Sequence, residues 1–488
     1  MSDKSVNQWK TLDKDLGRIW RLEQATQLIG RPLVAPGIAL AFIVLATVAS
    51  ALLLGASFSV IVIAAAAVGA YMALNIGAND VANNMGPAVG ANALTLGGAL
   101  VIAAICETAG ALIAGGDVVG TISSGIVAPD AVADAATFVW VMMAALLSAA
   151  LWINLATVLG APVSTTHSVV GGVVGSGIVA AGFTAVNWAS MGKIAASWVI
   201  SPVMGGVIAA VFLAFIKSRI LYRDDKIAAA RRWVPVLIGI MSGTFATYVA
   251  IKGLKKIVNV DLGAAVLIGL AVGVVTWAIV MPLIRRQSEG MENRKKSVKK
   301  LFGIPLVISA GLLSFAHGAN DVANAVGPLA AIVHTVEAGD VAAKVAIPAW
   351  VMVIGALGIS VGLVLFGPKL IRMVGSEITK LNPMRAYCVA LSAAITVIVA
   401  SWLGLPVSST HIAVGAVFGV GFFREWHSER RTRALGIRKG KVVAPDERKR
   451  RKLVRRNHFL TIAAAWVITV PASALLSALI YVILNAIA

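Results

Sequence analysis

Long apolar stretches separated by short polar segments recur along almost the whole chain. An ordinary soluble domain is about 45–50% apolar and about 25% charged, whereas this chain of 488 residues is 59% hydrophobic and 13% charged. A water-soluble fold could not cover so much apolar surface, so we predict an all-α protein that crosses a membrane about 12 or 13 times. The predicted spans lie near residues 35–56, 58–77, 95–115, 136–160, 165–184, 194–216, 233–252, 263–284, 303–318, 345–367, 384–403, 408–423 and 459–487.

The positive charges are clustered beside these stretches. Thirty-three of the 42 Lys and Arg residues fall in four segments, and only Lys193 lies between residues 33 and 216. Such clustering is the positive-inside pattern, which places these segments in the cytoplasm. The segments are 1–32, 217–232, 285–300 and 424–456. An even number of predicted spans separates each segment from the next, which agrees with that assignment.

The basic charge therefore favours a membrane topology over a nucleic-acid partner. A surface for nucleic acid or anionic lipid remains an alternative for 424–456 alone. The first 20 residues are polar and of mixed charge, so we expect no cleaved signal and a location in the plasma (inner) membrane. Cys106 and Cys388 both lie in apolar stretches, which favours buried, inert thiols over a disulfide or metal site, and no cofactor is expected.

Two motifs occur twice in the same order. Residues 77–87 read GANDVANNMGP and residues 318–328 read GANDVANAVGP, an offset of 241; residues 162–167 read PVSTTH and residues 406–411 read PVSSTH, an offset of 244. Two independent motifs that recur in order indicate a duplicated gene.

The span count gives the two copies opposite directions. The first GAND segment ends a predicted span that runs inward, and the second ends one that runs outward. Inverted repeats that meet at a midplane site, often with interrupted helices, are typical of secondary transporters. We therefore divide the chain into 1–57 (N-terminal segment and an extra helix), 58–216 (first repeat), 217–300 (two linking helices) and 301–488 (second repeat, with a basic insert at 424–458).

The GAND segments place a carboxylate and amides at membrane depth, where charged groups are by default functional. Their oxygens are hard ligands of the kind that bind Na⁺, or Asp80 could carry a proton. The neighbouring Gly and Pro residues permit an interrupted helix, which would free backbone carbonyls as further ligands. A purely structural polar contact between helices is the alternative. The candidate cation ligands are Asn79, Asp80 and Asn83, with Asn320, Asp321 and Asn324 in the second copy.

The PVSTTH and PVSSTH motifs place hydroxyl groups at the start of a helix. The first turn of a helix offers free backbone N–H groups and the positive end of its dipole, so hydroxyls there can help to bind an anion without Lys or Arg. Ordinary N-capping is the alternative reading. The candidate anion ligands are Ser164, Thr165 and Thr166, with Ser408, Ser409 and Thr410 in the second copy.

Three further titratable residues lie close to these motifs. Glu107 is either a cation-coupling carboxylate or a buried hydrogen-bonded acid, and the second half has no counterpart at the matching point. His167 and His411 end the hydroxyl motifs, where they could hydrogen-bond to the helix start or relay protons.

The doubled GANDVAN signature with PVSTTH and PVSSTH resembles the inorganic phosphate transporter (PiT) family over roughly residues 58–488. The resemblance implies about 12 spans, an inverted repeat, a homodimer and symport of inorganic phosphate with Na⁺ or H⁺. It also implies that the GAND residues bind cation or phosphate and that the Ser and Thr residues bind phosphate. The family includes sulfate carriers, so sulfate is an alternative substrate. The extra N-terminal helix departs from the family pattern.

Energetics explains why a coupling cation is expected. One charge moved against a membrane potential costs about 2.3 kcal/mol per 100 mV, so divalent phosphate faces about 4.6 kcal/mol. Two monovalent cations cancel that cost, and amide-rich oxygen sets favour Na⁺ over H⁺. A passive anion channel would use basic rings, which the core lacks. A hydrolase using Ser164 or Ser408 would need an oriented base, and none is predicted, so we expect no enzyme.

Overall fold

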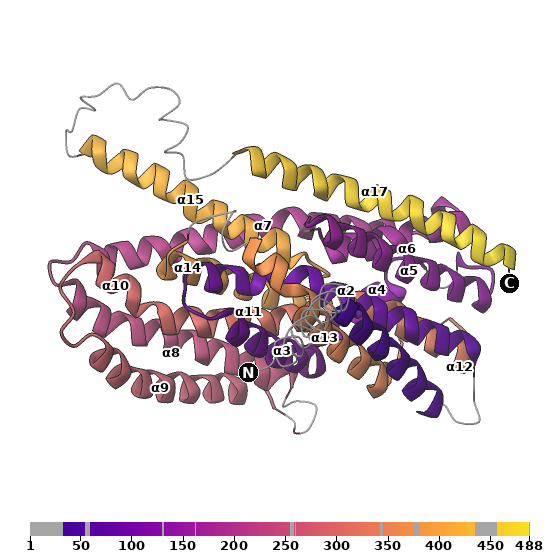
Figure 1. Cartoon of the computed structure of the whole chain (residues 1–488), viewed down its shortest axis with the longest axis horizontal. Coiled ribbons are helices and arrows are strands. Elements are labelled where there is room, and N and C mark those ends of the chain that lie inside the picture. The colour runs from indigo at the N-terminus through magenta and orange to yellow at the C-terminus, as the bar shows by residue number, and fades with distance from the viewer. Residues whose placement is uncertain are drawn as a thin grey trace, which may run out of the picture.

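The computed structural model describes residues 33–53, 59–128, 131–161, 163–253, 258, 260–341, 345–373, 381–434 and 456–487, and these are almost entirely helical. Long helices such as α8, α9 and α17 run along the long axis of the molecule (Figure 1). Eleven of the described helices are long and apolar enough to cross a membrane, and α6 is a shorter apolar helix. In chain order, and including the short helices that could not cross a membrane, the first described helix is Leu33–Leu53. The others are α2 (Val60–Gly90), α3 (Leu96–Ala114), α4 (Gly116–Ser124), α5 (Ala135–Leu159), α6 (Thr165–Ala181), α7 (Trp188–Ile216), α8 (Lys226–Lys252), α9 (Leu262–Gln287), α10 (Lys295–Leu301), α11 (Gly303–Asp321), α12 (Ala323–Ala338), α13 (Ala349–Met373), α14 (Pro383–Trp402), α15 (Ser409–Ala434) and α17 (Arg456–Ile487).

Each predicted apolar stretch corresponds to a helix, but the GAND segments do not end their spans. Helix α2 continues through the first motif without a break and ends at Gly90. In the second copy the chain is interrupted only at Val322, between α11 and α12. The polar residues of both motifs are buried and find side-chain or backbone partners, so the helices do not need to end where the apolar stretch ends.

The glycine of each GAND motif permits close helix packing. A Cβ atom on Gly77 would overlap the carbonyl oxygen of Ile359 on α13, and a Cβ atom on Gly318 would overlap that of Glu107 on α3. The two halves therefore interlock at the motif itself, with α2 against α13 and α11 against α3. Here the small residue brings two backbones together; it does not break the helix.

Each hydroxyl-motif helix packs on the opposite half of the molecule. Helix α6 lies against α17, and α15 lies against α7. From their buried starts near the middle of the molecule, α6 and α15 run toward opposite ends (Figure 1). The two halves are thus related by inversion, as the span count predicts.

The described basic segments meet at one end of the molecule. The Tyr222 hydroxyl, in the second basic segment, is hydrogen-bonded to Nε2 of His427, in the fourth, at 2.9 Å. Nζ of Lys295, in the third segment, lies over the Tyr222 ring. Helix α10 and the start of α8 lie at this same end (Figure 1). Residues 1–32 and 435–455 lie outside the described residues.

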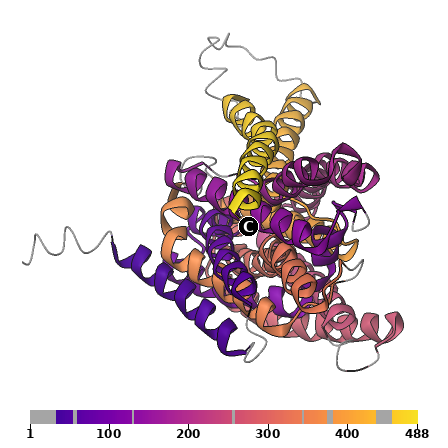
Figure 2. The same ribbon diagram turned by 90° about the vertical axis from the view of Figure 1, so that its right-hand side faces the viewer.

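The additional helices lie on the periphery. Helix Leu33–Leu53 packs on α2 and α13 through Ala46, which meets Ala66, Ala70 and Ile354. Figure 2 shows this helix, in indigo, at the edge of the bundle, and the pink α8–α9 pair at a different edge. The buried polar residues of both repeats lie inside the bundle that these peripheral helices surround.

Candidate functional site

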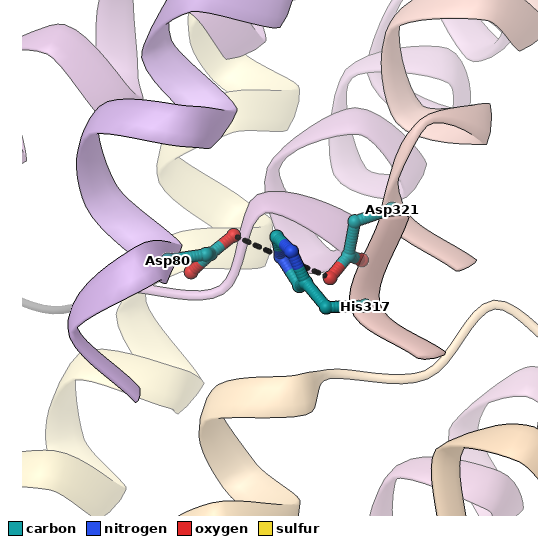
Figure 3. A group of neighbouring side chains, drawn as sticks. All are labelled: Asp80, His317 and Asp321. Atoms are coloured by element: carbon teal, nitrogen blue, oxygen red, sulfur yellow. Dashed lines mark ion pairs between the residues drawn. The ribbon is translucent and has the colours of Figure 1, made fainter. Parts of the chain in front are cut away.

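Two buried aspartates form the centre of the polar interior. Asp80 lies within α2 and Asp321 is the last residue of α11, and each is 1% exposed. The carboxylates point toward each other from the two halves, with the ring of His317 between them (Figure 3). One ligand atom from each of these three residues lies within 4.8 Å of the others.

Hydroxyl groups from both helix starts donate to these carboxylates in a twofold pattern. Each aspartate is approached by one hydroxyl from its own half and one from the other half. The contacts are Thr165 to Asp80 Oδ2 (2.9 Å), Thr410 to Asp80 Oδ1 (3.1 Å), Ser409 to Asp321 Oδ2 (3.1 Å) and Thr166 to Asp321 Oδ1 (3.2 Å). The Thr166 hydroxyl shares its single hydrogen with the Val407 carbonyl, which lies 3.0 Å away. The carboxylates and the first turns of α6 and α15 thus form one continuous site.

The second asparagine of each motif joins the same network across the halves. Asn83 Nδ2 donates to the Thr410 hydroxyl at 2.8 Å. Asn324 Nδ2 lies within hydrogen-bond distance of the hydroxyls of Thr165 and Thr166 and of Asp321 Oδ1. Oδ1 of Asn324 is buried and accepts no hydrogen bond from the residues that the structure describes. An unused oxygen beside two carboxylates is available to a cation.

The first asparagine of each motif is bound to the turn that precedes the hydroxyl helix of its own half. The amides of Asn79 and Asn320 use both their donor and their acceptor atoms for this. Asn79 contacts Thr157, Ala161 and Val163, and Asn320 contacts Ser401, Leu405 and Val407. The contacted turn residues are 244 positions apart in the two halves, and the two asparagines are 241 apart. The two amides therefore fix the position of the hydroxyl turns, and their assignment as cation ligands stays a prediction.

Ser164 and Ser408 cap the two helices. The Ser164 hydroxyl accepts the backbone N–H of His167 at 3.2 Å, and that of Ser408 accepts the N–H of His411 at 3.3 Å. These bonds are the N-capping that was the alternative for the motif. In the same turns, Thr165, Thr166, Ser409 and Thr410 supply the hydroxyls that face the carboxylates.

The two motif histidines are in contact with each other. The ring centroids of His167 and His411 are 4.4 Å apart, and the His167 ring also stacks on Trp198 at 3.7 Å. Nδ1 of His167 lies 2.6 Å from the Ser164 hydroxyl, so the histidine lies at the helix start as expected.

Glu107 lies in the site, together with two residues that the sequence did not single out. Asn84 Nδ2 donates to Glu107 Oε1 at 2.9 Å, and Nδ1 of His317 lies 3.3 Å from the same oxygen. A sequence signal for His317 exists, because it precedes the second GAND motif where Ile76 precedes the first. Asn84 is the third asparagine of GANDVANN, and the second copy has Ala325 there.

The site has three carboxylates and no permanent cation. No lysine or arginine is buried among the residues whose side chains the structure describes. A buried carboxylate is stable as an ion only when it is paired or well hydrogen-bonded. Asp80, Asp321 and Glu107 thus create a place that attracts cations.

Comparison with known proteins agrees with this architecture. The model of the family described as the phosphate transporter family matches residues 76–477. The chain belongs to this family. It is 45% identical to a Helicobacter pylori (strain ATCC 700392 / 26695) protein that carries the name phosphate permease, over 96% of this chain and 99% of that protein. It is 39% identical to one named in Pyrococcus abyssi, over 85% and 96% of the two chains.

A solved structure resembles this member of the phosphate transporter family closely. That structure, described as the sodium-dependent phosphate transporter, has a TM-score of 0.79 and 36% sequence identity, and the match covers 88% of this chain and all of that one. With 11 helices able to cross a membrane, this transporter-family protein is a multi-pass integral membrane protein.

Proposed function

We propose that the protein imports inorganic phosphate together with Na⁺ by alternating access of its two inverted halves. The observation that carries the proposal is the set of bonds between the hydroxyls at the two helix starts and the two aspartates. Residues suited to an anion and residues suited to a cation share one buried site, so one ion species affects the binding of the other.

The helix starts provide the anion half of the site. In the first turns of α6 and α15, the serine caps bond to the N–H groups of His167 and His411, and the N–H groups before these have no acceptors within their own helices. Both turns are directed into the interior, so their dipoles add to a positive potential at one place. An oxyanion can bind there through N–H groups and hydroxyls without a basic side chain.

The aspartates make the anion dependent on a cation. A divalent anion beside Asp80 and Asp321 would be repelled by both carboxylates. Monovalent cations between them remove the repulsion, and they also offset the cost of about 4.6 kcal/mol for two charges at 100 mV. Amide and hydroxyl oxygens around the carboxylates suit Na⁺ better than a proton alone. The related solved structure is described as a sodium-dependent phosphate transporter, which supports the same pair of ions.

The inverted packing supports alternating access. Helices α6 and α15 start at the shared site and run toward opposite ends of the molecule (Figure 1). Movement of one half against the other can therefore open the site to one side at a time. We propose that the working unit is a homodimer and that the protein acts as a carrier and not as an enzyme.

Uptake into proteoliposomes tests the proposal. Labelled phosphate and labelled sulfate are supplied separately, while Na⁺ and pH gradients are varied independently. We expect phosphate to accumulate against its gradient only with inward-directed Na⁺. Phosphate uptake that is indifferent to both cations would contradict symport, and preferential sulfate accumulation would replace phosphate as the substrate. Downhill flux only would identify a channel.

A further inference from the structure

Three polar side chains of the buried site have apolar residues at the equivalent positions of the other half. Residues of the GAND helices are related by an offset of 241. Gly110 on α3 lies against the carbonyl of Phe315, and Gly362 on α13 lies against that of Leu74. Since Phe315 and Leu74 are equivalent by the offset of 241, Gly110 and Gly362 are equivalent too, which gives α3 and α13 an offset of 252. The three pairs are Asn84 and Ala325, Glu107 and Ile359, and His317 and Ile76.

These three polar residues contact one another. Asn84 donates to Glu107 at 2.9 Å, and the same carboxylate oxygen lies 3.3 Å from Nδ1 of His317. All three side chains are fully buried. The symmetry is therefore broken by one connected group, which we call the asymmetric triad (Asn84, Glu107 and His317).

The triad holds an imidazole unequally between the two aspartates. Nε2 of His317 lies 2.8 Å from Oδ2 of Asp321 but 3.7 Å from Oδ2 of Asp80 (Figure 3). Both are ion-pair distances, and neither ring nitrogen makes a hydrogen bond within the described part of the chain, but the contact with Asp321 is shorter by 0.9 Å. The ring thus contacts Asp321 directly and leaves Asp80 at longer range.

The hydrogen bonds of the two aspartates differ in the same sense. A carboxylate offers about four lone-pair sites. Among the described residues, Asp321 is approached by Thr166, Ser409, Asn324 and His317, whereas Asp80 accepts hydrogen bonds from Thr165 and Thr410 and has His317 at the longer distance. Asp321 therefore has more close neighbours that can donate, and Asp80 retains more capacity for another ligand.

We propose that the asymmetric triad makes the two carboxylates inequivalent as cation ligands. Asp80 takes the first coupling cation, and Asp321 takes one only after the imidazole of His317 has withdrawn. Asn84 acts as a positioning residue, because it orients Glu107, which in turn orients the ring. The inference rests on the proposed symport and specifies the order in which its cations bind.

Direct Na⁺ binding to the purified full-length protein tests this order. Equilibrium binding of ²²Na⁺ is measured without phosphate for Asp80→Asn and Asp321→Asn, each in the parent and in a His317→Ile background. Isoleucine is the residue of the other half, so the fold already accepts it at this kind of position. In the parent we expect Asp80→Asn to weaken the tightest Na⁺ binding roughly tenfold or more, and Asp321→Asn to have a much smaller effect. In the His317→Ile background the two variants should become alike.

Asn84→Ala provides an independent readout, also with the residue of the other half. In the Asn84→Ala background, the losses of Na⁺ affinity caused by Asp80→Asn and Asp321→Asn should become more alike. Thr108→Ser is the control: this residue is next to Glu107 but bonds to Ser360, so the two losses should stay as different as in the parent. If His317→Ile does not fold, this comparison decides the matter. The proposal is overturned if Asp80→Asn and Asp321→Asn weaken Na⁺ binding equally in the parent. It is also overturned if their unequal effects on Na⁺ affinity persist in both the His317→Ile and the Asn84→Ala backgrounds.

The outcome can be separated from that of the proposed function. Ordered Na⁺ binding without phosphate uptake would leave this inference in place and overturn phosphate symport. Phosphate uptake without Na⁺ binding to the parent would overturn this inference and leave a proton-coupled carrier.

Discussion

Oγ of Ser360 lies 2.6 Å from Oγ1 of Thr108, and these residues occupy the same position in the two halves of the molecule. His167 and His411, which are also equivalent, are in contact at a second place. Contacts between equivalent residues mark the line about which one half is related to the other. The equivalent residues Asp80 and Asp321 lie on either side of that line.

Alanine at Gly77 or Gly318 should destabilise the protein. A methyl group at either position overlaps a backbone carbonyl of the facing helix, which cannot yield as a flexible side chain can. Overpacking of this kind costs about 1–3 kcal/mol. The midpoint of thermal unfolding in detergent should fall for both variants. Gly120→Ala is the matched control, because a Cβ on that exposed helical glycine meets nothing within 4 Å. Equal midpoints for Gly77→Ala and Gly120→Ala would contradict the packing argument.

The fold was largely predictable because its main determinants are local or repeated. Apolar stretches long enough to cross the bilayer and two repeated motifs indicate the spans and the inversion without any knowledge of contacts, while the orientation inferred from the charge clusters stays a prediction. The end of each GAND span was misplaced for a physical reason. Hydropathy treats Asn79, Asp80 and Asn83 as a place to stop, whereas buried partners from distant segments allow α2 to continue.

The site was predictable only as a set of residues, and their division of labour was not. Asp80 and Thr165 meet as expected, but Asn79 is engaged with Thr157 and Ala161 on a distant turn. His317 was missed because its difference from Ile76, at the matching position of the first copy, does not show which side chains it contacts. Glu107 has no counterpart in the second half, which the sequence showed, but its contact with His317 depends on the close approach of α3 and α11.

Removing the partner of Asn79 should reproduce the effect of removing Asn79. Asn79→Ala leaves the backbone N–H of Val163 and the carbonyl of Ala161 without their side-chain partner, and Thr157→Val removes one acceptor. Loss of buried partners costs about 1–3 kcal/mol. Both variants should lower the unfolding midpoint, Asn79→Ala the more strongly.

The dependence of that midpoint on Na⁺ distinguishes positioning from ligation. If Asn79 is a positioning residue, added Na⁺ should still raise the unfolding midpoint of Thr157→Val. In Asn79→Ala, the rise with Na⁺ should become smaller, and the midpoint without Na⁺ should fall as well. If Asn79→Ala removes the Na⁺ response while the midpoint without Na⁺ stays at the parent value, Asn79 is a cation ligand.

Breaking the ion pair between α4 and α8 should have a small, salt-dependent effect. Nζ of Lys252 lies 2.7 Å from Oδ2 of Asp117, and both side chains are partly exposed. Partly exposed pairs contribute about 0–1 kcal/mol. Asp117→Asn and Lys252→Met should each lower the unfolding midpoint slightly at low salt, and the double variant should cost little more than either single one. Strict additivity in this double-mutant cycle would show that the pair contributes no coupling energy.

Thr410→Val should impair transport far more than a valine at another buried threonine. The Thr410 hydroxyl donates to Asp80 from the opposite half and accepts from Asn83, so its loss leaves two buried polar groups unpaired at the shared site. A hydrogen bond to a charged group contributes about 1.5–3 kcal/mol, which corresponds to roughly 10–100-fold in an apparent constant. Initial rates of phosphate uptake, measured across phosphate and Na⁺ concentrations, should show weaker apparent affinity for both ions. Thr396→Val is the control, since within the described part of the chain that buried hydroxyl donates to the Ser392 carbonyl on its own helix. A Thr410→Val protein with the same two affinities as Thr396→Val would show that contacts between the halves at Asp80 do not couple the two ions.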